Sequence, residues 1–375
     1  MNALRARGVA FQATGLGGPA LRAAGLRAVA PMESVAVMGF AEVLRHLPEI
    51  QKTRRALRAL LAASPGAVFL PIDSPGLNLG LARDAHRAGL RVLYYVCPQI
   101  WAWGGGRVAR LREDVDRTLL LFRFEEELLR RAGVACRWVG HPAGALRPDE
   151  ELRAMARREL GIDDRESLIA VLPGSRRGEV RRHLAPMLDA AARLVNEGAK
   201  PARVAVSDAG PVAAEAQRGE SARLWATVRP IHHTGSAEPL LRAADVALVA
   251  SGTATLEAAA LGAPLVVVYR TGWLNYQIAR RIVRLPTIGL ANILVAAETK
   301  AKGGPPPAPE CVQGDATGPS IARAAAPLLA DPAQRSRQRA AFASLHETLG
   351  GPGSADRAAE ALLEFVAAPA QARSA

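Results

Sequence analysis

Two glycine-bearing turns, each placed between an apolar run and a helical pattern, constrain the fold of this chain most strongly. The first turn, at residues 173–176, follows the apolar run 168–172, and the second, at 251–253, follows the run 246–250. Short apolar runs of this kind are typical of strands buried in a parallel sheet. A strand that passes through small residues into a helix leaves the first N–H groups of that helix free to bind an anion. The two turns therefore predict phosphate-binding positions.

The residues after the second turn complete a βαβ unit. Gly262, Ala263 and Pro264 end the helical pattern, and residues 265–269 form a further apolar run. Units of this kind bind nucleotides at the carboxyl ends of their strands. A nucleotide or nucleotide sugar is therefore the expected ligand.

Strand and helix patterns alternate in two series, which predicts an α/β fold of two facing, doubly wound, Rossmann-like domains. In the first series, strands are expected at 67–72, 91–96, 118–122 and 136–139, and helices at 40–61, 77–88, 105–114 and 125–132. The second series has a helix at 148–160 and strands at 168–172, 203–206, 246–250 and 265–269. We expect domains at 1–145 and 146–340, with helices of 341–375 packing back over the domain junction.

The start of the chain is rich in Arg and Ala, as in an organelle transit peptide. Residues 9–14 nevertheless have the pattern of a strand, and residues 15–19 that of a tight turn before a short helix at 20–24. We therefore interpret the start as part of the folded N-terminal domain.

Composition excludes several classes of protein. The length of 375 residues suits two domains. The three cysteines, Cys97, Cys136 and Cys311, form no C-x-x-C pair, so neither a disulfide framework nor a zinc site is indicated and a reducing cytoplasm is expected. No apolar run is long enough for a membrane-spanning helix. The motifs of serine hydrolases and P-loop NTPases are also missing.

The net charge of +13 favours anionic partners: nucleic acid, a membrane surface or an acidic substrate. A general bias towards arginine is the competing explanation. Aromatic residues make up 4% of the chain and do not alternate with basic residues, which argues against nucleic acid. Apolar positions in 35–50 beside Lys52, Arg54 and Arg55 match an amphipathic helix on an anionic bilayer, although a core helix has the same spacing.

Several segments together resemble the lipid-A-disaccharide synthases, which are inverting glycosyltransferases of the two-domain GT-B type. The resemblance covers nearly the whole chain and is carried by residues 35–44, 72–78, 95–103, 139–142, 172–176 and 251–253. It implies transfer of 2,3-diacylglucosamine from UDP-2,3-diacylglucosamine to 2,3-diacylglucosamine 1-phosphate (lipid X), which yields the β-1,6 disaccharide of lipid A and UDP. It also implies no metal or cofactor, a Gram-negative source and peripheral attachment to the cytoplasmic face of the inner membrane. A homodimer is compatible with the sequence.

The family pattern begins with a strand and a glycine-rich Ala-Gly-Glu-x-Ser-Gly-Asp loop, and this chain has neither of them. Either the true start lies upstream of Met1 or the chain is a defective copy; we expect an upstream start, because no motif downstream has decayed. Cys97 stands where the family usually has serine.

Inverting transfer needs a base for the acceptor hydroxyl and positive groups for the departing diphosphate. Asp73 follows a predicted strand and matches the essential aspartate of the family, so it is the candidate base; the alternative is an N-cap for the helix 77–88. Arg176 follows the first turn and is the candidate partner of the diphosphate, unless it is a surface arginine.

Further residues are candidates for nucleotide-sugar binding. The backbone and hydroxyl donors of the two turns would bind the diphosphate; these are Gly174, Ser175, Ser251, Gly252 and Thr253. Glu257 would accept ribose hydroxyls, or would complement the start of its helix. Glu310 and Gln313 belong to a segment that resembles a family element near the nucleotide.

Candidate contacts to the acceptor or its acyl chains lie in the first domain. Met38 and Phe40 belong to the amphipathic stretch, and Trp101 and Trp103 suit a sugar or acyl chain as well as a core. Arg107 would reach the acceptor phosphate. His141, at the domain junction, is either catalytic or a hydrogen-bonding hinge residue.

Two other functions remain open from the sequence. One is another UDP-N-acetylglucosamine-using enzyme of the same architecture, against which the Trp101–Trp103 segment argues. The other is a truncated UDP-sugar-binding protein without turnover, which would bind UDP and form no disaccharide.

Overall fold

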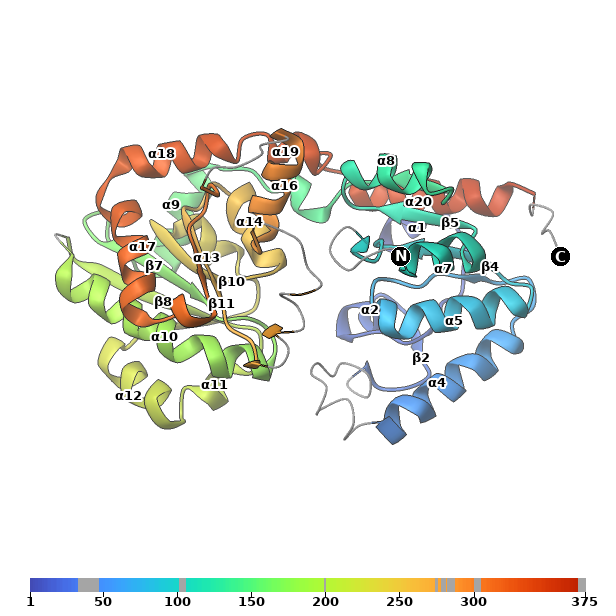
Figure 1. Cartoon of the computed structure of the whole chain (residues 1–375), viewed down its shortest axis with the longest axis horizontal. Coiled ribbons are helices and arrows are strands. Elements are labelled where there is room, and N and C mark those ends of the chain that lie inside the picture. Colours follow the sequence, from blue (N-terminus) through green and yellow to red (C-terminus); the bar gives the residue numbers. More distant parts are fainter. Residues whose placement is uncertain are drawn as a thin grey trace. The chain divides into compact units, whose positions relative to one another are not determined.

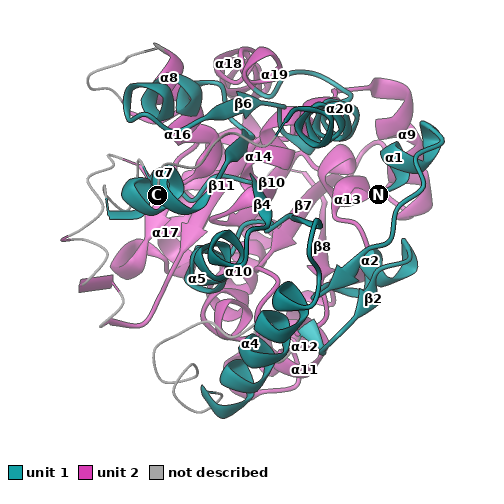
Figure 2. Cartoon of the chain, turned by 90° about the vertical axis from the view of Figure 1, so that its right-hand side faces the viewer, with its two compact units in different colours: residues 1–142, 349–375 teal, residues 143–348 magenta. Residues whose placement is uncertain are grey.

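The computed structural model describes residues 1–32, 47–100, 106–198, 200–273, 276–277, 281, 287–299 and 305–369. The chain divides into two units: unit 1 contains Met1–Pro142 and Leu349–Ala375, and unit 2 contains Ala143–Thr348 (Figure 2). The first boundary lies three residues before the predicted one at 145. The last helix, Ser354–Ala367, belongs to unit 1, whereas the two helices just before it, Pro332–Ala341 and Leu345–Thr348, belong to unit 2.

Unit 2 contains a parallel sheet of six described strands in the order β12-β11-β10-β7-β8-β9. The strands are β7 (Ser167–Leu172), β8 (Ala202–Asp208), β9 (Ile231–Thr234), β10 (Val246–Ala250), β11 (Leu265–Tyr269) and β12 (Glu310–Val312). Numbered within the unit, this is the order 3-2-1-4-5-6 of the doubly wound Rossmann fold. The predicted α/β class is therefore confirmed.

Helices cover both faces of this sheet (Figure 1). They are α9 (Glu150–Glu159), α10 (Arg177–Glu197), α11 (Val212–Glu215), α12 (Gly219–Val228), α13 (Glu238–Ala243), α14 (Thr253–Ala260), α16 (Leu290–Thr299), α17 (Gly318–Ala330), α18 (Pro332–Ala341) and α19 (Leu345–Thr348), with short 3-10 turns at Pro142–Ala145 and Gln313–Asp315. Val180, Leu184 and Met187 of α10 pack into one core with Ile169 and Leu248 of the sheet. The strand residues that alternate with these, such as Leu168 and Val249, are buried on the other face of the sheet.

Unit 1 contains a four-stranded parallel sheet in the order β3-β4-β5-β6 and a separate pair, β1-β2. The strands are β1 (Thr14–Gly15), β2 (Arg27–Ala28), β3 (Val68–Phe69), β4 (Arg91–Tyr95), β5 (Arg117–Leu120) and β6 (Cys136–Trp138). The helices are α1 (Asn2–Ala6), α2 (Pro19–Ala23), α4 (Leu47–Ala62), α5 (Pro75–Arg87), α7 (Gly106–Asp114), α8 (Phe124–Arg131) and α20 (Ser354–Ala367).

Local patterns misplaced several strands. The strand predicted at 9–14 is wrong except at its last residue, because β1 pairs only with the two residues of β2. The strand predicted at 67–72 is shorter, and beyond β3 only Ile72 bridges to Tyr95. β9 and β12 were not predicted, because both are short edge strands and β9 carries polar residues. No described helix is long and apolar enough to cross a bilayer.

Candidate active site

The sheet of unit 2 places both predicted turns at the carboxyl ends of two neighbouring strands. β7 and β10 are neighbours, while β8 and β9 continue on one side and β11 and β12 on the other. The connections after β7 and β10 therefore diverge, which creates the ligand-binding crevice typical of doubly wound sheets at the carboxyl ends of these two strands. Residues 173–176 follow β7 and residues 251–253 follow β10. The structure thus brings the two turns together.

In the first turn, an internal carboxylate occupies the anion-binding donors. Glu179 accepts a hydrogen bond from the Ser175 backbone N–H (3.2 Å) and another from Arg176 Nη1 (2.8 Å). Arg176 is the N-cap of α10, and its side chain is 55% exposed. Gly174 has φ +113° and lies directly against the Glu179 side chain. One carboxylate thus engages the same donors that a phosphate would use.

The second turn leaves the start of its helix uncapped. Gly252, with φ +145°, is the N-cap of α14, and no side chain caps that helix. Ser251 Oγ donates to the Ile288 carbonyl at 2.9 Å, so this hydroxyl fixes the turn to the neighbouring loop. Thr253 is exposed at the first helical position. The N–H groups of the first turn of α14 are therefore oriented to receive an anion.

Glu257 lies in the second turn of α14 and is half-buried. Burial raises the pKa of its carboxyl group, and the negative charge of Glu238 adds to this increase. Stabilisation by the helix start would lower that pKa instead. The shift of the Glu257 pKa therefore has the direction that burial gives.

Glu310 and Gln313 have their polar atoms engaged within the protein. The Glu310 carboxylate accepts from the Thr287 hydroxyl, from the N–H groups of Ile288 and Gly289, each at 2.9 Å, and from Asn292. It thereby fixes the loop whose Ile288 carbonyl binds Ser251. Gln313 Oε1 accepts from the Thr271 N–H at 2.7 Å. Both residues therefore act on the predicted site through the loops to which they are hydrogen-bonded.

In unit 1, Asp73 has a strained backbone held from several sides. Asp73 and Ser74 both have φ +49°, a backbone conformation that residues other than glycine rarely adopt. The Asp73 N–H donates to Tyr95, and its carbonyl accepts from Tyr94 Oη and Asn78 Nδ2, each at 2.7 Å. Ser74, not Asp73, is the N-cap of α5. The N-cap interpretation of Asp73 is therefore wrong, and its exposed carboxylate forms no hydrogen bond within the described ranges.

The other candidates in unit 1 differ in their surroundings. Burial raises the pKa of Tyr94, the charge of Asp73 adds to the increase, and Arg107 opposes it, so both charges lie near this hydroxyl. Burial lowers the pKa of His141 to about 4, and its ring stacks on Phe122. Met38, Phe40, Trp101 and Trp103 lie outside the described residues.

The sequence interpretation missed Glu179, Tyr94 and Asn78. Glu179 had a signal, because an acidic residue three positions after a helix start is the second half of a capping box. Tyr94 and Asn78 had none, since their hydroxyl and amide meet the Asp73 carbonyl only through tertiary contacts.

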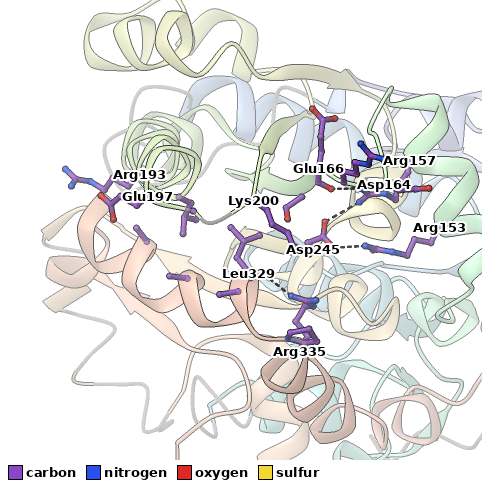
Figure 3. A pocket seen from close by; sticks show the side chains of 18 of the residues that line it. Arg153, Arg157, Asp164, Glu166, Arg193, Glu197, Lys200, Asp245, Leu329 and Arg335 are labelled. Atoms are coloured by element: carbon purple, nitrogen blue, oxygen red, sulfur yellow. Dashed lines mark hydrogen bonds and ion pairs between the residues drawn. The ribbon is translucent and has the colours of Figure 1, made fainter.

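A cavity of about 910 Å³ lies at the opposite edge of the unit 2 sheet. It is lined at the amino ends of β7 and β10, by Ser167 and Asp245, and by α9, α10 and α17 (Figure 3). Asp245 forms ion pairs with Arg153 (2.8 Å) and Arg157 (3.2 Å). These paired charges secure α9 to the sheet, so this charged cluster of the cavity has a structural role. In the described part of the chain, no three His, Cys, Asp or Glu side chains gather as metal ligands.

Comparisons with known proteins agree on one family. The family model described as lipid-A-disaccharide synthetase matches residues 1–365. The lipid-A-disaccharide synthase of Pseudomonas aeruginosa is 40% identical over 370 residues, which cover 98% of this chain and 93% of that protein. The lipid-A-disaccharide synthase of Anaeromyxobacter sp. (strain K) is 41% identical over 358 residues, which cover 94% of this chain and 89% of that protein.

Among solved structures, a calicheamicin glycosyltransferase superposes with a TM-score of 0.54 at 16% identity, covering 98% of this chain and 94% of that one. This likeness shows a GT-B fold of two Rossmann-like domains. Together with the family match, it means that the chain belongs to the lipid-A-disaccharide synthase family of glycosyltransferases.

Proposed function

We propose that this chain transfers 2,3-diacylglucosamine from UDP to the 6-hydroxyl of 2,3-diacylglucosamine 1-phosphate and releases UDP. The observation that carries the proposal is the pair of glycine turns at the carboxyl ends of β7 and β10, where a doubly wound sheet binds its nucleotide. Family membership over residues 1–365 supports the same reaction.

In this proposal the diphosphate binds to the two turns of unit 2. Backbone N–H groups at Ser175, Gly252 and Thr253 bind its oxygens, and Arg176 exchanges Glu179 for the phosphate. Negative charge grows on the diphosphate as its bond to the sugar breaks, and the guanidinium stabilises that charge. Glu257 binds the ribose hydroxyls. Glu310 and Gln313 position the loops around the nucleotide.

Unit 1 supplies the base in this proposal. The attacking hydroxyl oxygen forms its bond to the anomeric carbon opposite the departing UDP, and its proton passes to the Asp73 carboxylate. The strained backbone at Asp73, held by Tyr94, Tyr95 and Asn78, fixes where that carboxylate lies. Arg107 binds the acceptor phosphate, and Met38, Phe40, Trp101 and Trp103 contact the acceptor or its acyl chains.

Two substitutions separate these roles. Asp73→Asn is expected to reduce disaccharide formation by about 10³-fold or more while UDP affinity stays unchanged, because only the base is lost. Arg176→Ala is expected to weaken UDP binding by about tenfold and to lower turnover as well. Disaccharide formation is measured by chromatography with both lipid substrates, and UDP affinity by calorimetry.

Matched controls are Asp84→Asn and Arg223→Ala, which remove surface ion pairs of unit 1 and unit 2. Wild-type turnover in Asp73→Asn would remove Asp73 as the base. UDP binding by the wild-type chain without any disaccharide would favour the binding-protein alternative.

The proposal places the chain on the cytoplasmic face of the inner membrane. The net charge of +13 and the exposed side chains of Lys52 and Arg55 on α4 support binding to anionic lipid, whereas Leu57 and Leu61 of the same helix face the core of unit 1. We expect cosedimentation with phosphatidylglycerol vesicles at low salt and release at high salt, because exposed charges are screened. Lys52→Glu/Arg55→Glu should bind less, and equal binding to neutral phosphatidylcholine would contradict an electrostatic mechanism.

A further inference from the structure

His183 is a buried polar residue on the apolar face of α10, and the proposed reaction assigns it no role. Its side chain is 1% exposed, and neighbouring residues of the same face, Val180, Leu184 and Met187, belong to the core of unit 2. A polar ring buried in such surroundings destabilises the fold unless its nitrogens are hydrogen-bonded. The partners of the two ring nitrogens therefore indicate what the ring does.

Both nitrogens bind main-chain atoms outside α10. Nδ1 lies 3.0 Å from the Pro173 carbonyl, and the Arg270 N–H donates to Nε2 at 2.9 Å. A carbonyl only accepts and an N–H only donates, so these two bonds require a neutral ring with its proton on Nδ1. The Arg270 carbonyl also lies 3.1 Å from Nε2, where it would accept a bond from the protonated ring.

These two contacts connect strands on either side of β10. Pro173 opens the first turn at the end of β7, and Arg270 follows the last residue of β11. β10, which carries the second turn, lies between β7 and β11 in the sheet. The imidazole thus spans the two strand ends that flank the second turn, and Gln313 holds the neighbouring Thr271 N–H from the far side.

We propose that His183 is a positioning residue for the diphosphate of the nucleotide sugar. It holds the Pro173–Ser175 turn at a fixed spacing from the turn at Ser251–Thr253, so that donors of both turns meet one diphosphate. The inference rests on the proposed function, because that function places the diphosphate at these turns. His183 acts through the main chain and touches no substrate.

The same geometry makes diphosphate binding sensitive to acid. Burial lowers the pKa of the His183 imidazole. The charges of Glu179 and Arg182 on α10 act on this pKa in opposite directions, and the Tyr269 ring of β11 lies beside the imidazole. The ring is therefore neutral near pH 7. Protonation at lower pH removes the acceptor for the Arg270 N–H and turns Nε2 into a donor, which shifts the end of β11 relative to the first turn.

The test compares UDP affinity by calorimetry in variants of the 375-residue chain. His183→Leu leaves the Pro173 carbonyl and the Arg270 N–H without their partner, and we expect UDP binding to weaken by about tenfold or more. His183→Gln offers one donor and one acceptor and should stay within about threefold of wild type. Leu184→Ala, which is fully buried on the same helix, is the control for destabilisation alone.

The pH dependence gives a second readout. From pH 7.5 to 5, the affinity of wild type relative to His183→Gln should fall, because only the histidine takes up a proton. Wild-type affinity in a folded His183→Leu, or an equal loss in Leu184→Ala, overturns the inference. If His183→Leu does not fold, His183→Asn takes its place, because its shorter amide does not span both main-chain groups, and wild-type UDP affinity in that variant overturns the inference. A wild-type chain that binds no UDP overturns the proposed site and this inference together, whereas UDP binding without disaccharide formation refutes the proposed reaction only.

Discussion

Gly174 and Gly252 have backbone conformations that other residues adopt only with strain, yet their surroundings differ. Gly174 has φ +113°, and a Cβ there would lie 2.7 Å from Glu179 Oε2 and 2.8 Å from Glu179 Cβ. Gly252 has φ +145° and ψ −159°, a region open almost exclusively to glycine, but a Cβ there would meet no atom within 4 Å. A comparison of substitutions at the two glycines therefore distinguishes the effect of backbone strain from that of steric contact.

We expect Gly252→Ala to lower the free energy of unfolding by about 1–3 kcal/mol through strain alone, and Gly174→Ala to lower it further because Glu179 must also move. Both should weaken UDP binding, since each displaces N–H groups of a turn. Urea unfolding and calorimetry measure the two effects. Gly210→Ala, with φ +124° and no nearby atom, is the control for strain in unit 2. Equal destabilisation by Gly174→Ala and Gly252→Ala would show that the contact with Glu179 has no influence.

At the scale of elements, one acidic side chain fixes α9 to the amino edge of the unit 2 sheet. Asp245 precedes β10, pairs with Arg153 and Arg157 of α9, and accepts from the Leu168 N–H of β7 at 2.8 Å. The Arg157 guanidinium also donates to the carbonyls of Ala243, Asp163 and Glu166. Helix, strands and loop therefore depend on a single carboxylate, at the edge of the sheet opposite the glycine turns.

Asp245→Asn should lower the free energy of unfolding by about 2–4 kcal/mol, because it leaves two largely buried guanidinium groups without their counter-charge. UDP affinity should stay within about twofold of wild type, since the turns follow the other ends of the strands. Urea unfolding and calorimetry test both statements. The exposed pair Arg131–Glu127 provides the control, and Arg131→Ala should change stability by less than about 1 kcal/mol. Loss of UDP binding in folded Asp245→Asn would show that the two edges are coupled.

At the scale of the whole molecule, both units contain a histidine that burial keeps neutral: His141 in unit 1 and His183 in unit 2. Burial lowers the pKa of His141 from 6.5 to about 4, and that of His183 is lowered as well. The unfolded chain therefore takes up protons near pH 6.5 that the folded chain refuses. The stability is complete above that pH and declines as the pH falls towards 4.

We expect the free energy of unfolding to drop by about 2 kcal/mol between pH 7 and pH 5 on account of His141 alone. The measurement is urea unfolding of wild type and His141→Gln over this range, and the variant should show the smaller drop. Identical pH profiles for the two proteins would mean that His141 is not buried in its neutral form.

Local chemistry alone determined the α/β class, the two series of strands and helices and the two glycine turns. Apolar runs indicate buried strands, and Gly174 and Gly252 indicate turns, because these preferences depend on a few adjacent residues. The family could also be recognised, because its motifs are short and local. The roles of Asp73, Arg176 and the other proposed site residues stay predictions.

Only the tertiary structure decided how these parts meet. The strand order of unit 2, which brings the turns after β7 and β10 together, depends on pairing between segments far apart in sequence. The strained backbone of Asp73 depends on Tyr94 and Asn78, and the spacing of strand ends depends on His183. A sequence pattern records the preferences of neighbouring residues. It does not record which distant hydroxyl, amide or imidazole satisfies a main-chain group, because that partner exists only once the chain has folded.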